Sequence, residues 1–81
     1  LTNRIVINMD NNQIGTNAGI IWRTLNASNT KMSINDLQSN TRLSEIDILM
    51  AIGWLAREGQ ILIIEERGIK YFLIYYEQFY F

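Results

Sequence analysis

The spacing of apolar residues is helical through the middle of the chain and becomes β-like toward its end. A first helical face is formed by Ile14, Ala18, Ile21, Trp22 and Leu25. This spacing predicts a helix that begins near Ile14 and ends in the polar segment 26–30. Before it, residues 4–9 (RIVINM) alternate loosely and are rich in β-branched side chains. They predict a short strand, followed by a turn at residues 10–13.

Two serine motifs predict the starts of two further helices. Ser33 is followed three residues later by Asp36, and Ser44 by Asp47. In such a capping box the hydroxyl and the carboxylate satisfy backbone amides that have no partner within the helix. The third helix is expected to stop at Gly59, because a left-handed residue after a helix favours glycine.

Residues 60–76 contain two β-rich runs around EERG, where Gly68 suits the positive φ of a tight hairpin. The order is three helices and a hairpin, with a tight connection between the second and third helices. This order predicts an α+β winged helix-turn-helix, with three helices, a C-terminal β-hairpin wing and an extra N-terminal strand. We expect one domain over residues 1–81, with its core in 14–76, the strand and turn in 1–13 and an aromatic tail in 77–81.

Three segments carry a resemblance to a known family: IGTNAGIIWRTLN, MSINDLQ and MAIGWLAREGQI. The chain from Ile14 to Leu73 resembles small bacterial winged helix-turn-helix proteins of unknown function, best known from gut Bacteroidetes. GWLAREG at residues 53–59 is the most specific part. The resemblance implies a stand-alone winged helix that is grouped with DNA-binding proteins by its fold, with no established target and no catalytic residues. Fold alone does not settle function.

The composition restricts the chemistry. The chain has no cysteine and no histidine, so it lacks thiolate ligands, the commonest zinc ligand and the usual general base. It also lacks the glycine-rich phosphate-binding motifs. We therefore expect no enzyme activity, no cofactor, no metal site and no small-molecule substrate. Residues 1–12 resemble neither a signal peptide nor a membrane span, which predicts a cytoplasmic protein without a membrane partner.

The net charge gives no general attraction to nucleic acid. Seven basic residues stand against eight acidic ones, for a net charge of -1. Any basic surface must therefore be local. The candidate contacts to phosphate are Arg42 before the third helix, Arg57 near its end, Arg67 and Lys70 at the hairpin tip, with Asn40 and Thr41 assisting. Since Glu65 and Glu66 halve the positive field at the tip, an ordinary solvated turn is the competing interpretation.

The third helix is expected to bury Ile48, Ile52 and Leu55. Its outward side chains would then be Glu45, Ile46, Asp47, Met50, Gly53, Trp54 and Arg57. With one basic and two acidic side chains, this would be a poor DNA-binding face. The acids stabilise the amino end of the helix by capping and through its dipole, or alternatively discourage DNA binding.

Ile46, Met50 and Trp54 follow one another at intervals of four residues and form an apolar ridge. This ridge predicts a protein or dimer interface, unless the wing or the first strand covers it. Gly53 costs about 1 kcal/mol of helix stability relative to alanine, which suggests close approach by another backbone.

Both faces of the second hairpin strand are apolar, whereas the three helices need to cover only one. The other face must meet the first strand, the tail or a second copy, which predicts a homodimer. Tyr76 and Phe79 join the ridge as interface candidates. The aromatic tail could alternatively stack on bases, but interleaved basic residues are missing.

Two functions remain at this point. The first is a non-enzymatic, DNA-binding module of the transcription-regulator type, whose binding of double-stranded DNA would be weak and salt-dependent. The alternative is a protein-interaction or dimerisation module on a winged helix that does not bind DNA.

Overall fold

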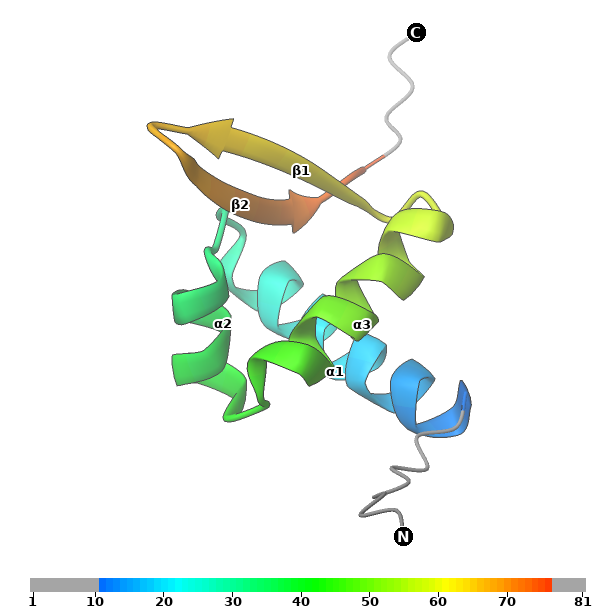
Figure 1. Cartoon of the computed structure of the whole chain (residues 1–81). Helices are drawn as coiled ribbons and strands as arrows, with labels where there is room; N and C mark the ends of the chain where they lie inside the picture. Colours follow the sequence, from blue (N-terminus) through cyan, green and yellow to red (C-terminus); the bar gives the residue numbers. More distant parts are fainter. Residues whose placement is uncertain (1–10, 77–81) are drawn as a thin grey trace, which may run out of the picture.

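The computed structural model of the chain describes residues 11–76, which form three helices and an antiparallel hairpin (Figure 1). The elements are α1 (Asn11–Ser28), α2 (Ile34–Thr41), α3 (Glu45–Arg57), β1 (Ile61–Glu66) and β2 (Ile69–Ile74). The helices lie on one side of the hairpin, whose tip extends above α2. This is the predicted winged helix fold.

Local hydrogen bonds explain where the helices begin and end. The Ser33 hydroxyl accepts from the Asp36 amide at 3.2 Å, and the Ser33 amide donates to the Asp36 carboxylate at 3.0 Å. The Ser44 hydroxyl accepts from the Asp47 amide at 3.1 Å. Gly59 follows α3 with a φ of 68°. These observations confirm the complete capping box at Ser33 and the predicted glycine stop, whereas Ser44 caps α3 through its hydroxyl without the expected bond to the Asp47 carboxylate.

The amino-terminal prediction needs a correction. The turn expected at residues 10–13 is wrong in its described part, because α1 begins at Asn11. Apolar periodicity cannot detect this first turn, which is polar throughout. The first four amides of a helix have no partner within the helix, so polar side chains suit this position. The strand predicted at residues 4–9 lies outside the described residues.

The core lies where α1, α3 and the hairpin meet. The predicted inward face of α1 is buried at Ala18, Ile21 and Leu25, with Trp22 half-buried. The other buried apolar residues are Leu37 on α2, Ile48, Ala51, Ile52 and Leu55 on α3, and Ile61, Phe72 and Ile74 on the hairpin. One apolar stripe of α3 is therefore fully used by the fold.

A single residue of the α1–α2 loop extends the sheet. The Met32 amide donates to the Phe72 carbonyl at 2.9 Å, and the Phe72 amide donates to the Met32 carbonyl at 2.8 Å. This bridge covers the edge of β2 and ties the wing to the helices. Phe72 and Ile74 face the core, while Tyr71 and Leu73 are half-buried on the opposite face of β2.

We expect adjacent residues of α3 to differ sharply in their effect on stability. Ile48 is fully buried, whereas Leu49 is exposed. Ile48→Ala should lower the free energy of unfolding by about 2–5 kcal/mol, because it leaves a cavity. The matched control Leu49→Ala should change it by no more than about 0.5 kcal/mol. Urea denaturation of both variants measures the difference in dilute solution, where association through the outward face of α3 does not contribute. Equal losses there would contradict the orientation of α3.

Candidate nucleic-acid interface

The turn between α2 and α3 presents Arg42 to solvent. Arg42 has a left-handed backbone, with a φ of 63°, and its amide donates to the Gln38 carbonyl at 2.8 Å. The Thr41 hydroxyl donates to the carbonyl four residues earlier at 2.7 Å and accepts from the Leu43 amide at 3.2 Å. The Asn40 side chain donates to a carbonyl within α2 at 2.8 Å. Asn40 and Thr41 therefore have structural partners in the turn, while the Arg42 side chain is exposed.

The hairpin tip presents Arg67 in a similar backbone conformation. β1 and β2 are joined by Arg67 and Gly68, with φ values of 54° and 79°. Positive φ at both positions is the signature of a type I′ turn, which favours Asn or Gly at the first position. An arginine there costs about 1 kcal/mol of backbone strain. The predicted role of Gly68 is confirmed.

Two lysines near the wing are held in ion pairs. The Lys70 ammonium lies 3.3 Å from the Glu65 carboxylate, across the hairpin. The Lys31 ammonium lies 2.8 Å from Glu66 and 5.1 Å from the centre of the Tyr71 ring. The hydrogen bond and the charge of Glu66 raise the pKa of Lys31. Both acids of the wing are thus engaged, and they reduce the charge that these lysines offer to a ligand.

The three arginines that were predicted to contact phosphate are exposed. Within residues 11–76, Arg42, Arg57 and Arg67 form no ion pair. They do not form one cluster, because α3 separates Arg42 from Arg57 by about 20 Å of helix. Arg67 stands in the loop between β1 and β2, and the tip of this hairpin extends on the side of α2 (Figure 1). The cations are therefore spread over the helix-turn-helix and the wing.

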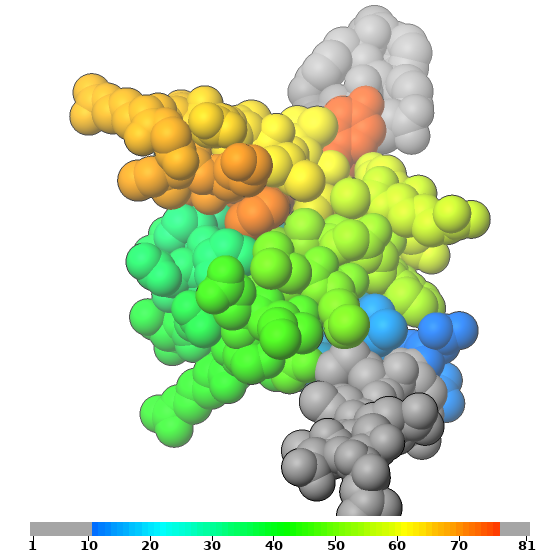
Figure 2. Space-filling model, in the orientation of Figure 1, coloured from blue at the N-terminus to red at the C-terminus, as the bar shows by residue number. Residues whose placement is uncertain are grey.

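The outward face of α3 is strongly apolar. Ile46 is 65% exposed, Leu49 47% and Met50 45%. In Figure 2 the surface of α3, green to yellow-green, is open at the front of the molecule below the wing. Leu49 was missed from the sequence, although it lies three residues after Ile46. The charged residues Glu45 and Arg57 stand at the two ends of this face.

Two expectations for α3 are not met within the described residues. Trp54 does not point outward but is half-buried, with its ring 3.5 Å from the position that a Cβ of Gly15 would occupy. This is an ordinary van der Waals distance, so α1 packs on the indole at Gly15, where the wing or the first strand was expected. Gly53 has no close neighbour, since no atom of the described residues lies within 4 Å of its Cβ position. Its small size therefore serves no contact within residues 11–76.

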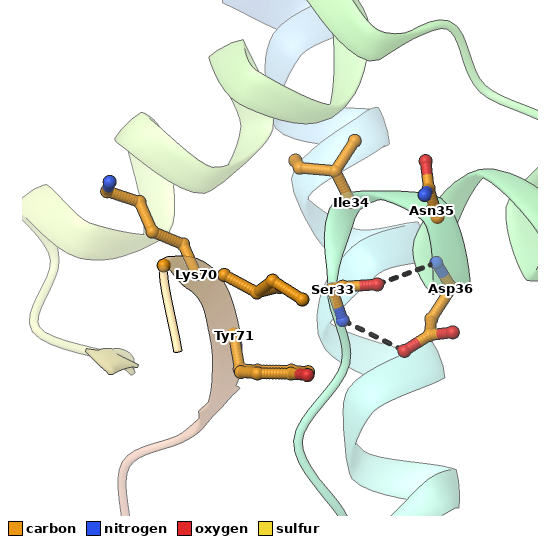
Figure 3. Close-up of a pocket in the computed structure, with 8 residues that line it drawn as sticks. Ser33, Ile34, Asn35, Asp36, Lys70 and Tyr71 are labelled. Carbon is orange, nitrogen blue, oxygen red and sulfur yellow. Dashed lines mark hydrogen bonds between the residues drawn. The ribbon is translucent and has the colours of Figure 1, made fainter. Parts of the chain in front are cut away.

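Between the wing and the start of α2 lies an open hollow of ≈ 530 Å³ (Figure 3). Two of its polar lining residues, Ser33 and Asp36, are already paired with each other in the capping box. Lys70 extends away from these two residues, and its ammonium pairs with Glu65. The Asp36 carboxylate makes the hollow unsuitable for an anion.

Other kinds of site receive no support from the described part of the chain. Residues 11–76 contain no group of three metal-ligating side chains. None of the described helices has both the length and the apolarity needed to cross a membrane. The exposed groups of interest are therefore the arginines and the outward face of α3.

Comparisons with known proteins agree with this architecture. Residues 9–74 match the model of a family described as a winged helix-turn-helix domain (DUF2582). The solution structure of protein BT2368 from Bacteroides thetaiotaomicron is similar, with 35% identity, a TM-score of 0.75, and coverage of 82% of this chain and 79% of that one. A second similar structure comes from a study of the DNA recognition and protein interaction domains of HOP2 and its homologous DNA pairing properties. This HOP2 chain is 29% identical in sequence to the chain described here. Its TM-score is 0.62, with coverage of 72% and 97%. No functionally curated protein matches significantly in sequence.

We expect Arg67→Asn to stabilise the domain. Asparagine adopts the left-handed backbone of this turn more readily than arginine, so the free energy of unfolding should rise by roughly 0.5–1 kcal/mol. Arg57→Asn is the matched control, because it makes the same side-chain change in a helical residue. The control should lower stability by up to about 0.5 kcal/mol. Thermal denaturation compares the two, and a loss of stability in Arg67→Asn would show that the arginine side chain stabilises the wing.

Proposed function

The chain belongs to the winged helix-turn-helix domain (DUF2582) family, and we propose that it is a non-enzymatic module that binds duplex DNA through the phosphate backbone. The observation that carries this proposal is the placement of unpaired, exposed arginines at the helix-turn-helix turn and at the wing tip. These are the parts of a winged helix that approach a duplex. The likeness to HOP2, a protein studied for DNA recognition, supports the same function.

Arg42 and Arg67 are the principal contacts in this proposal. Each stands on a tight turn with a left-handed backbone, which holds the base of the side chain at a fixed place on the surface. A guanidinium presents several donors to phosphate oxygens and stays charged at any relevant pH. Arg57 and Lys70 add weaker contacts. Lys70 is weaker because phosphate must compete with Glu65 for its ammonium.

The same proposal assigns little recognition of base sequence to α3. Base edges are recognised by hydrogen bonds and by apolar contacts in the major groove. The exposed side of α3 consists of Glu45, Ile46, Leu49, Met50, Gly53, Ala56 and Arg57. Of these, Arg57 alone can donate a hydrogen bond from its side chain, and it stands at the end of the helix. Binding is therefore expected to be weak, largely independent of sequence and strongly reduced by salt.

A second candidate function is favoured by a separate observation. Ile46, Leu49 and Met50 form a continuous apolar face on the outward side of α3. Methionine is enriched at the centres of protein interfaces. This face suits a protein-interaction module. A protein bound to this face would keep α3 from contacting DNA, but it would leave Arg42 and Arg67 free to bind phosphate.

The test of DNA binding is a titration of the labelled chain with random duplex DNA at about 50 mM salt, where non-specific binding is strongest. We expect amide shifts near Arg42, Arg67 and Lys70 that disappear as salt is raised. Arg42→Gln and Arg67→Gln should each weaken binding and reduce the slope of log affinity against log salt by about 1.

Arg23→Gln is the matched control. Arg23 is also exposed, but it lies on α1 beside Gly19 and Trp22, outside the helix-turn-helix and the wing. Its replacement should leave the affinity almost unchanged. Absence of binding at low salt, or an equal loss in Arg23→Gln, would refute the proposed contacts.

A further inference from the structure

The exposed apolar face of α3 has the spacing of a helix-pairing surface. Ile46, Leu49, Gly53 and Ala56 recur at intervals of three, four and three residues, and all four are exposed. We call these four residues the α3 stripe. Residues at this spacing form the contact seam between two packed helices. The buried side of α3 contacts α1 and the hairpin, so the α3 stripe has no partner within the described chain.

The α3 stripe is complementary to itself in size. Its amino-terminal half carries two large side chains, and its carboxy-terminal half carries glycine and alanine. In an antiparallel pair of α3 helices centred on Ala51, Ile46 lies opposite Ala56 of the second copy. Leu49 then lies opposite Gly53. Each large side chain thus meets a small one, which is how packed helices fill space without voids. A parallel pair would place large on large and small on small.

The charges at the two ends of α3 favour the same orientation. The first turn of α3 carries Glu45 and Asp47, and the last turn carries Arg57. An antiparallel pair brings the acidic turn of one copy beside the basic turn of the other. It also opposes the two helix dipoles favourably. A parallel pair would bring like charges together at both ends.

We infer that the α3 stripe is the contact surface for a second copy of this chain, in a two-fold antiparallel pair of α3 helices. Gly53 then has a role that the described part of a single copy does not give it, because its bare Cα makes room for Leu49 of the second copy. The inference rests on the second candidate function and gives that function its partner. Arg42 and Arg67 lie outside the α3 stripe, so self-association and DNA binding can be tested separately.

The first experiment measures the molar mass of the chain in solution by sedimentation equilibrium without DNA. We expect a concentration-dependent rise from 9.5 kDa to twice this mass. Gly53→Leu should weaken the dimer by about tenfold or more, because the added side chain fills the space for Leu49. In the dilute monomer the same change should be tolerated and should raise Tm, since leucine favours a helix more than glycine.

Leu49→Glu should also abolish the dimer, and Leu62→Glu is its matched control. Leu62 is exposed to a similar extent but stands on β1, away from the α3 stripe. A single-chain mass up to about 1 mM would overturn the inference. A dimer that survives both α3 changes, or one that Leu62→Glu disrupts equally, would overturn the assignment of its surface.

The second experiment tests the antiparallel register. The chain has no cysteine, so Ile46→Cys and Ala56→Cys each introduce a single thiol. A mixture of the two variants should form a disulfide between copies on air oxidation. Ile46→Cys alone should not, because its two thiols are separated by about 15 Å along the pair, beyond the reach of a disulfide. Ready cross-linking of Ile46→Cys with itself would refute the antiparallel pair.

Discussion

The burial of one side of α3 is the constraint on which the rest of the structure depends. The domain has one core, and α3 supplies four of its fully or nearly fully buried residues, Ile48, Ala51, Ile52 and Leu55. A small domain has no second layer to cover the opposite side of such a helix. Within residues 11–76 no element covers that side, so its side chains are exposed there. The apolar Ile46, Leu49 and Met50 therefore matter more for function than for the stability of the single chain.

The acidic start of α3 shows how a local stabilising interaction limits function. Ser44 caps the helix, and Glu45 and Asp47 are favourable beside the positive end of its dipole. The same carboxylates would repel phosphate if this end of the helix entered a groove. These acidic residues thus stabilise α3 but weaken its ability to bind DNA as a recognition helix. Arg42, three residues before Glu45, is the basic residue nearest to these carboxylates in the sequence and could offset this repulsion.

Most of the architecture was predictable because it depends on local rules. The serine caps, the glycine at the end of α3 and the turn at Gly68 each follow from the conformational preference of one or two residues. The Met32 bridge to Phe72 was not predicted, because one pair of backbone hydrogen bonds leaves no periodic signal. The first turn of α1 was missed for a related reason, since it has no apolar residue to reveal it.

The errors on the candidate surface arise from neighbours that periodicity cannot see. Trp54 stands at the border between the two sides of α3, and it packs inward against α1 beside Gly15. The spacing of residues within α3 does not tell which residue of α1 lies opposite Trp54. The opposite holds for Gly53, for which a neighbour was expected and none exists within the described chain.

The two left-handed arginines connect stability to the question of DNA binding. Arg42 and Arg67 each occupy a backbone conformation that glycine or asparagine adopts more easily, and neither side chain gains an ion pair within residues 11–76. Strain without compensation inside the fold is commonly found where a residue acts on a ligand. In a small domain, about 1 kcal/mol at each of two turns is a noticeable fraction of the total stability. Both strained residues are cations, one at the turn of the helix-turn-helix and one at the tip of the wing. Their charge and placement are a physical reason to test an anionic polymer such as DNA as their binding partner.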